Sequence, residues 1–126
     1  MESKQPGKQR KRHFNAPLHK RQNKIAAPLS HNLRKTHNKR NMPVRKGDEV
    51  TVTRGDNKGK KGKVTRVDLL SYRVEVQGLV RRNAKGEELP VPIPASNIKI
   101  TTLDLTDEKR KKKLNRVAKE VKKHGK

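Results

Sequence analysis

The 126-residue chain contains no cysteine, no tryptophan, a single phenylalanine and a single tyrosine. The lack of cysteine excludes a disulfide framework, a thiolate metal site and a cysteine nucleophile, and it favours a reducing, intracellular setting. No run of residues is long and apolar enough to predict a membrane span, and the basic N-terminus lacks the apolar core of a secretion signal. With so few aromatic residues, a core must be built from Val, Ile and Leu, and a base-stacking platform is disfavoured.

Acidic residues are also scarce, since 12 Asp and Glu stand against 35 Lys and Arg, for a formal net charge of +23. A protein with this charge repels itself until a polyanion binds to it and releases counterions. Nucleic acid is therefore the expected partner. The alternatives are a highly charged surface without a partner and an anionic membrane, for which the chain offers only a weak amphipathic segment near its C-terminus.

Composition divides the chain into three segments. Residues 1–43 form a basic N-terminal extension, residues 44–103 hold most of the acidic and apolar residues, and residues 104–126 form a basic C-terminal tail. We expect the middle segment to fold as one small domain. We expect the first arm, up to about Ile25, to be extended and disordered until it binds a partner, because it has no apolar periodicity.

Short helices are predicted on both sides of the middle segment. Ser30 is a candidate N-cap for a helix over residues 31–37, and Pro43 then turns the chain extended. Thr106 is a candidate N-cap for a C-terminal helix, whose first turn holds two acids that complement the helix dipole. This second helix has a narrow apolar stripe at helical spacing, which consists of Leu114, Val117, Ala118 and Val121.

The middle segment is predicted to be mainly β, as a small barrel or sandwich. Alternating apolar and polar residues predict strands over residues 50–53, 63–68, 72–76, 89–93 and 98–100. The fourth of these strands has prolines at three alternate positions, Pro90, Pro92 and Pro94. Proline has no amide donor, so this strand must lie at the edge of a sheet or be irregular.

The turn between the first two strands has the most informative sequence. Residues 44–68 read VRKGDEVTVTRGDNKGKKGKVTRVD, a strand, a glycine-rich basic turn and a second strand. Gly55, Gly59 and Gly62 permit tight or left-handed backbone geometry. Four lysines crowded together destabilise the turn unless an anion lies across them, so we interpret it as a phosphate-contact loop; the alternative is an ordinary turn with solvated lysines. It is no nucleotide-binding P-loop, because its last glycine-lysine pair precedes valine.

This segment resembles the KOW motif, and the chain resembles one KOW family, large-subunit ribosomal protein 24 of archaea, called 26 in eukaryotes. The flanking segments resemble that family in order over roughly residues 8–115, at residues 14–19, 28–34, 83–86, 96–98 and 106–110. One turn departs from the family pattern, since Pro94 and Ala95 stand where the family has a His-Pro pair. The resemblance implies an SH3-like β barrel that binds large-subunit ribosomal RNA near its 5′ part, early in assembly, close to the exit of the peptide tunnel.

On this resemblance we expect a cytoplasmic protein of the large ribosomal subunit, with ribosomal RNA, neighbouring ribosomal proteins and tunnel-exit targeting factors as partners. We expect no enzyme activity, no cofactor, no bound metal, no membrane insertion and no small-molecule substrate. The alternative functions are a KOW-type transcription elongation factor, a histone-like protein that compacts DNA, and a barrel that binds proline-rich peptides.

The expected RNA-binding residues lie in the first arm, before and within the basic turn, and in a second turn after the third strand. The second turn has a solvated β edge as its alternative interpretation. The barrel would dock through the turns, and the arms would thread between RNA helices and order there. The residues are Arg10, Lys11, Arg12, His13, Lys20, Arg21, Arg45, Lys46, Arg54, Lys58, Lys60, Lys61, Lys63, Arg81, Arg82 and Lys85.

The remaining candidate groups carry weaker signals. The histidines of the first arm lack cysteine partners and a fixed fold, so we expect them to contact bases or phosphates, or to be solvated, rather than to bind zinc. Phe14 is expected either to stack on a base or to pack on the barrel. Nothing in the sequence supports catalysis, because carboxylate pairs in a pocket and nucleophile signatures are absent. The histidines are His13, His19, His31 and His37.

Overall fold

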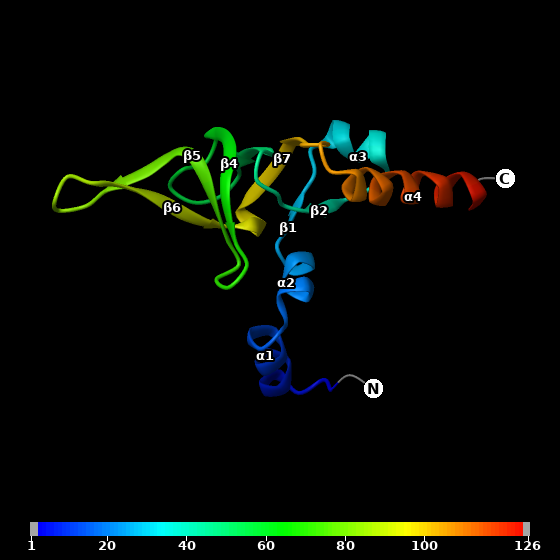
Figure 1. The fold of residues 1–126 in the computed structure, drawn as a ribbon, viewed down its shortest axis with the longest axis horizontal. Coiled ribbons are helices and arrows are strands. Elements are labelled where there is room, and N and C mark those ends of the chain that lie inside the picture. Colours follow the sequence, from blue (N-terminus) through cyan, green and yellow to red (C-terminus); the bar gives the residue numbers. More distant parts are fainter. Residues whose placement is uncertain (1–2, 125–126) are drawn as a thin grey trace.

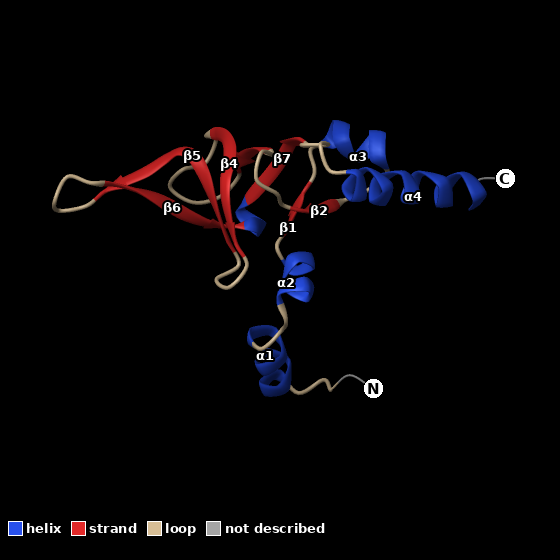
Figure 2. Cartoon of the chain, in the orientation of Figure 1, coloured by secondary structure: helices blue, strands red, loops and turns tan. Residues whose placement is uncertain are grey.

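The computed structural model describes residues 3–124, and it describes the side chains of residues 3–116. Its centre is a five-stranded antiparallel sheet with the strand order β6-β5-β4-β3-β7 (Figures 1 and 2). The mainly β fold flanked by helices confirms the expected small, barrel-like KOW architecture. The strands are β3 (Glu49–Val52), β4 (Lys61–Asp68), β5 (Arg73–Arg82), β6 (Glu88–Pro94) and β7 (Ile98–Thr102), and the 3-10 helix η1 (Ala95–Asn97) leads from β6 into β7.

The five strands overlap those that the alternation of apolar and polar residues predicts, but their bounds differ, most of all for β5, which continues to Arg82 and not only to residue 76. The alternation places Tyr72 at the start of the third strand, and it instead lies in the β4–β5 turn with a left-handed φ of 56°. The cause is local, because the carboxylate of Asp68 accepts hydrogen bonds from the amide of Leu70 at 2.9 Å and from the hydroxyl of Ser71 at 2.5 Å. These bonds close the turn before β5 begins.

The core extends beyond the middle segment. Ile25, Ala27, Leu29 and Met42 are at most 2% exposed, and they come from the N-terminal extension around β1 (Ala26–Pro28) and β2 (Asn41–Pro43). These two short strands pair with each other in an antiparallel sheet of their own. The second half of the N-terminal extension is therefore part of the folded body. The sheet contributes the aliphatic residues that composition requires, among them Val50, Val52, Val64, Val74, Val76, Ile98 and Ile100.

The two edges of the sheet differ. At β7, Leu29 forms a parallel bridge with Ile100, and the amide of Ser30 donates to the carbonyl of Ile100 at 2.8 Å. At the other edge, β6 pairs with β5 on one side and has no strand of the described chain on the other. This confirms the prediction of an edge strand, in which the three prolines lie at alternate positions and have no amide to donate.

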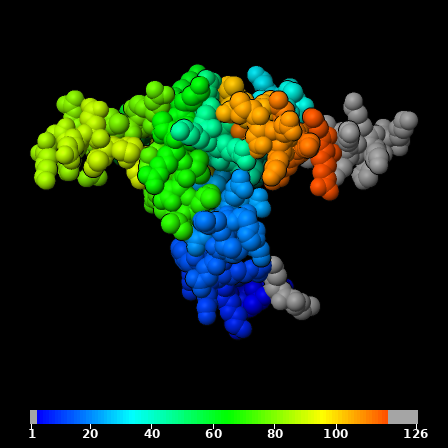
Figure 3. Space-filling model, viewed as in Figure 1, coloured from blue at the N-terminus to red at the C-terminus, as the bar shows by residue number. Residues whose placement is uncertain are grey.

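The first arm contains two helices, α1 (Pro6–Phe14) and α2 (Leu18–Lys24), which project from the body (Figures 1 and 3). The expectation that this arm has no regular structure is therefore wrong. Pro6 occupies the first turn, where its missing amide costs nothing, and basic residues in the last turns of both helices complement the helix dipoles. Neither helix buries a residue, which explains why no apolar periodicity marks them in the sequence.

Two further helices flank the sheet. The structure confirms the helix predicted over residues 31–37 as α3 (His31–His37), although the side chain of its N-cap residue, Ser30, makes no capping hydrogen bond. The C-terminal helix is α4 (Glu108–His124). Asp107 caps α4 in place of the predicted Thr106, because its carboxylate accepts from the amide of Lys109 at 3.1 Å. Of the predicted apolar stripe, Leu114 is buried; the side chains of Val117, Ala118 and Val121 lie outside the described residues.

Candidate nucleic-acid interface

The basic turn between β3 and β4 is held by backbone hydrogen bonds at its base. The amide of Gly59 donates to the carbonyl of Val52 at 2.8 Å, and the amide of Val52 donates to the carbonyl of Lys60 at 2.9 Å. Gly55 and Gly59 have φ values of 94° and 86°, which only glycine adopts without strain. The turn is therefore a fixed platform and not a loose connection.

The basic side chains of this turn point to solvent. Lys60 donates to the side-chain oxygen of Asn57 at 3.0 Å, and no ion pair with a carboxylate is described for any of the group. A cluster of like charges on a rigid turn repels itself and gains from an anion laid across it. The exposed members are Arg54, Lys58, Lys60, Lys61 and Lys63.

Gly62 serves a different purpose from the other two glycines. Its φ is not left-handed, and a Cβ placed there would lie 2.6 Å from the carbonyl oxygen of Gln77 and 2.7 Å from Val76 Cγ1. The missing side chain allows β4 to lie close against β5. Because Lys61 and Lys63 flank Gly62, this contact fixes the part of β4 that displays them.

The second predicted basic turn lies at the tip of the β5–β6 hairpin, which extends away from the body (Figure 1). All residues from 80 to 90 are exposed. Arg82 forms an ion pair with Glu88 across the hairpin at 3.5 Å, whereas Arg81 and Lys85 have no such partner among the described residues. The hairpin therefore carries Arg81 and Lys85 away from the basic cluster on the β3–β4 turn.

The basic residues of the first arm fall into two groups. Arg10, Lys11, Arg12 and Lys20 are exposed, and His13 and Arg21 are partly buried at the contact between the arm and the β4–β5 turn. The guanidinium of Arg21 donates to the carbonyls of Ala16 at 2.6 Å, Leu70 at 3.1 Å and Phe14, so it holds the arm against the turn.

Tyr72 completes this attachment of the arm. Its hydroxyl donates to the carbonyl of His13 at 2.8 Å, its ring stacks on the His13 ring at 4.4 Å, and the guanidinium of Arg21 lies 5.5 Å from its centre. Phe14 contacts only the edge of the His13 ring among the described ring pairs, and it is 63% exposed. Phe14 therefore does not pack on the barrel.

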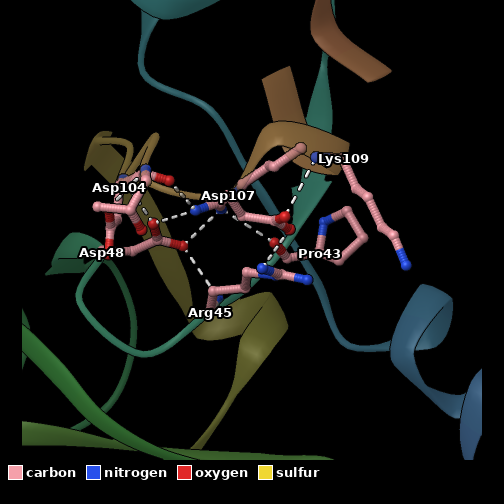
Figure 4. Close-up of polar contacts among 8 residues, drawn as sticks. Pro43, Arg45, Asp48, Asp104, Asp107 and Lys109 are labelled. Atoms are coloured by element: carbon pink, nitrogen blue, oxygen red, sulfur yellow. Dashed lines mark hydrogen bonds and ion pairs between the residues drawn. The ribbon is translucent and has the colours of Figure 1, made fainter. Parts of the chain in front are cut away.

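A buried ion pair fixes the loop that leads into β3. Asp48 is fully buried and Arg110 is 4% exposed, and the guanidinium of Arg110 donates to both carboxylate oxygens of Asp48, at 2.6 and 2.7 Å (Figure 4). The same guanidinium donates to the carbonyls of Asp104 and Pro43, at 2.8 and 3.2 Å. Arg45 joins this network through its amide, which donates to Asp48 at 2.9 Å, and through an ion pair with Asp107.

Hydrogen bonds surround both members of this buried pair. A bidentate arginine–carboxylate pair is stable in a protein interior only when hydrogen bonds satisfy its remaining donors and acceptors. Here the amide of Asp104 also donates to Asp48 at 2.9 Å. The pair joins the root of α4 to the loop that carries Arg45 and Lys46, so the helix and the barrel keep a fixed relation.

Sequence patterns do not reveal this ion pair. Arg110 lies within the basic run of residues 109–113 and looks like its neighbours. One signal could have found it, because Arg110 and Leu114 are four residues apart and therefore share the buried face of a helix. A cation on that face requires a buried acid as its partner. Residue spacing within the helix cannot identify this acid, because Asp48 lies in a distant part of the sequence.

The described residues contain neither a group of three His, Cys, Asp or Glu that could hold a metal nor a helix that could span a membrane. Residues 3–117 match a family model that comprises the eukaryotic ribosomal proteins L26 and their archaeal counterparts, ribosomal proteins 24. The chain belongs to this family. It is accordingly a ribosomal protein and not an enzyme, as the resemblance implied.

Three relatives, each named large ribosomal subunit protein uL24, show how closely the chain follows the family. The protein of Methanothrix thermoacetophila is 52% identical over 92% of this chain and 100% of its own length. That of Methanosphaera stadtmanae is 49% identical over 90% and 97%, and that of Korarchaeum cryptofilum 48% identical over 92% and 88%. These names support the expected large-subunit location.

Proposed function

We propose that this chain is a structural component of the large ribosomal subunit that binds ribosomal RNA through phosphate contacts, with the β3–β4 turn as its main docking element. The observation that carries this proposal is the exposed lysine cluster on a turn whose backbone is fixed. Because the backbone of the turn is already ordered, binding loses side-chain entropy but little backbone entropy, so more of the attraction to phosphates is retained as affinity. Membership of a ribosomal protein family supports RNA over other polyanions.

The proposed binding residues are the exposed cations of the turn, the β5–β6 hairpin and the first arm. Arg21 and Arg45 contribute differently, because their guanidinium groups hold the arm and the α4 root within the protein. The resemblance also supports early binding near the 5′ part of the RNA and a place close to the tunnel exit. Neighbouring ribosomal proteins and tunnel-exit targeting factors would then be its protein partners.

A salt series tests the proposal. Binding of the full chain is measured to large-subunit RNA fragments and to duplex DNA of equal length. We expect RNA to bind more tightly at every salt concentration, with a logarithmic salt slope of about −0.7 to −0.9 per phosphate contact. Equal affinity for DNA at every salt would overturn the proposal.

The turn itself is tested by charge removal. Lys58→Gln with Lys61→Gln removes two exposed cations and should make the slope shallower by about 2. Lys99→Gln is the control, because this lysine lies on β7, outside the cluster. An unchanged slope in the double variant would exclude the turn as the docking element. Co-sedimentation with the large subunit through a high-salt wash is expected for the unmodified chain.

A further inference from the structure

A second group of cations lies between α3 and α4, away from the residues assigned above. The loop after α3 forms an open notch of about 430 Å³ lined by Arg34, Asn38, Lys39 and Arg40. None of these four residues is acidic. Lys113 of α4 lies close enough to repel Lys39, and α3 packs against α4 (Figure 1).

The notch is preformed by the backbone around it. Asn38 ends α3 in the left-handed conformation, with a φ of 49°, and so turns the chain back beside the helix. The carbonyl of Arg40 then accepts the amide of Leu29 at 2.9 Å, and the next residue enters β2. Two strands and a helix end therefore hold the lining residues in place.

Among the described residues, no carboxylate forms an ion pair with the charges of the notch. The Nε atom of Arg34 is buried and has no hydrogen-bond partner among the described residues. Burial lowers the pKa of Lys39 below its usual value, and the positive charge of Lys113 lowers it further. A buried guanidinium donor without an acceptor and a desolvated ammonium beside a like charge are both unfavourable in the free chain.

We propose that this notch is a phosphate-binding site for the RNA backbone, formed by Arg34, Lys39 and Arg40, with Lys113 of α4 beside Lys39. A phosphodiester oxygen accepts from the terminal nitrogens of the Arg34 guanidinium, whose Nε stays buried, and its negative charge offsets the repulsion between Lys39 and Lys113. Because the notch is open, a polynucleotide chain can run through it. This inference rests on the proposed function, and it adds an RNA contact at the opposite end of the molecule from the β5–β6 hairpin (Figure 1).

The chemical reactivity of the unmodified chain gives a direct test. Lys39 should react with an acylating reagent faster than Lys35, an exposed lysine of α3 outside the notch, because a lower pKa leaves more neutral amine. Large-subunit RNA at about 10 times its Kd leaves roughly a tenth of the sites free, so the acylation of Lys39 should slow about tenfold. Lys35 should change much less.

Charge removal gives the second test, with a matched control on the same helix. Lys39→Gln should reduce the salt slope of RNA binding by about 1 and weaken binding several-fold, and Lys35→Gln should leave the slope nearly unchanged. Equal effects of the two variants would overturn the notch, because they would indicate diffuse charge alone. Arg34→Lys retains a cation without the planar guanidinium, and it should recover only part of the affinity lost in Arg34→Gln.

The outcomes separate this site from the proposed function. If the unmodified chain binds large-subunit RNA but Lys39 is not protected, the notch is wrong and the proposed function stands. If the chain does not prefer this RNA to duplex DNA, the proposed function fails. Protection of Lys39 by polyglutamate or by vesicles of anionic lipid, but not by RNA, would assign the notch to another polyanion and overturn the inference.

Discussion

The two basic ends of this chain have similar compositions, but they attach to the body in different ways. The first arm buries no residue in α1 or α2, and it is held by hydrogen bonds at the surface, from Arg21 and Tyr72. The root of α4 is held by the buried pair of Asp48 and Arg110 and by buried Leu114. Net charge predicts a polyanion partner for both ends, whereas a single buried acid anchors the first turns of α4 to the barrel.

The largest expected effect comes from breaking the buried pair. Arg110→Ala leaves the Asp48 carboxylate buried without its partner, and it should lower the free energy of unfolding by about 3–5 kcal/mol. Urea unfolding measures this change. Lys111→Ala, at the exposed neighbouring position, is the control and should stay within about 0.5 kcal/mol. Similar values for both variants would show that the buried pair does not anchor α4, and would remove the contrast between the two ends.

The apolar part of the same attachment should have the next largest effect. Leu114→Ala removes a side chain that is 3% exposed and should cost about 2–3 kcal/mol in the same unfolding measurement. Asn115→Ala, one position along the exposed face, should be close to neutral. A neutral Leu114→Ala would mean that the ion pair alone holds α4.

The first arm should respond locally. Tyr72→Phe removes the 2.8 Å hydrogen bond to the His13 carbonyl, which contributes about 1 kcal/mol, and it keeps the ring stack. Amide exchange in α1 should become faster, with the urea midpoint unchanged. A shift of the midpoint would show that the arm unfolds together with the core, and would remove the contrast between the two ends.

The smallest effect is a pH dependence of the same contact. The hydroxyl of Ser71 and the amide of Leu70 lower the pKa of Asp68 below its usual 3.8, and the turn that they close supplies the Leu70 carbonyl to Arg21. The ionised carboxylate of Asp68 stabilises the turn fully above about pH 4, and this stabilisation is lost as the pH falls through the lowered pKa. Amide exchange of the turn and α1 should therefore accelerate only below about pH 4. Asp68→Asn should abolish this step, and its persistence there would assign it to another group.

The sequence predicts the strands but not the helices of the first arm, because only the strands have a buried face. A strand such as β3 alternates because Val50 and Val52 face the core, so its pattern is visible in the residues themselves. The helices α1 and α2 consist mainly of basic and other polar residues and contain no buried residue, so they leave no periodic signal. The buried position of Arg110 could not be predicted for another reason, because it stands in a run of basic residues that all look alike in the sequence.

The site could be predicted only in part, for a related reason. Glycines and lysines between two strands indicate the basic turn, because both the backbone geometry and the charge are encoded locally. The notch between α3 and α4 depends on Lys39 and Lys113, which are far apart in the sequence and meet only through the packing of two helices. Likewise, the local sequence does not distinguish Arg21, whose guanidinium donates to the Leu70 carbonyl, from its exposed neighbour Lys20.

The two edges of the sheet have a consequence for newly synthesised copies of the protein. An open strand edge templates pairing with a second chain, and this is a common route to aggregation. Here Leu29, next to β1, bridges to the β7 edge, and the prolines of β6 offer no amide donors at three alternate positions. Pairing between the sheets of two copies is therefore disfavoured at both edges, and this backbone protection remains when salt or bound anions screen their charge repulsion.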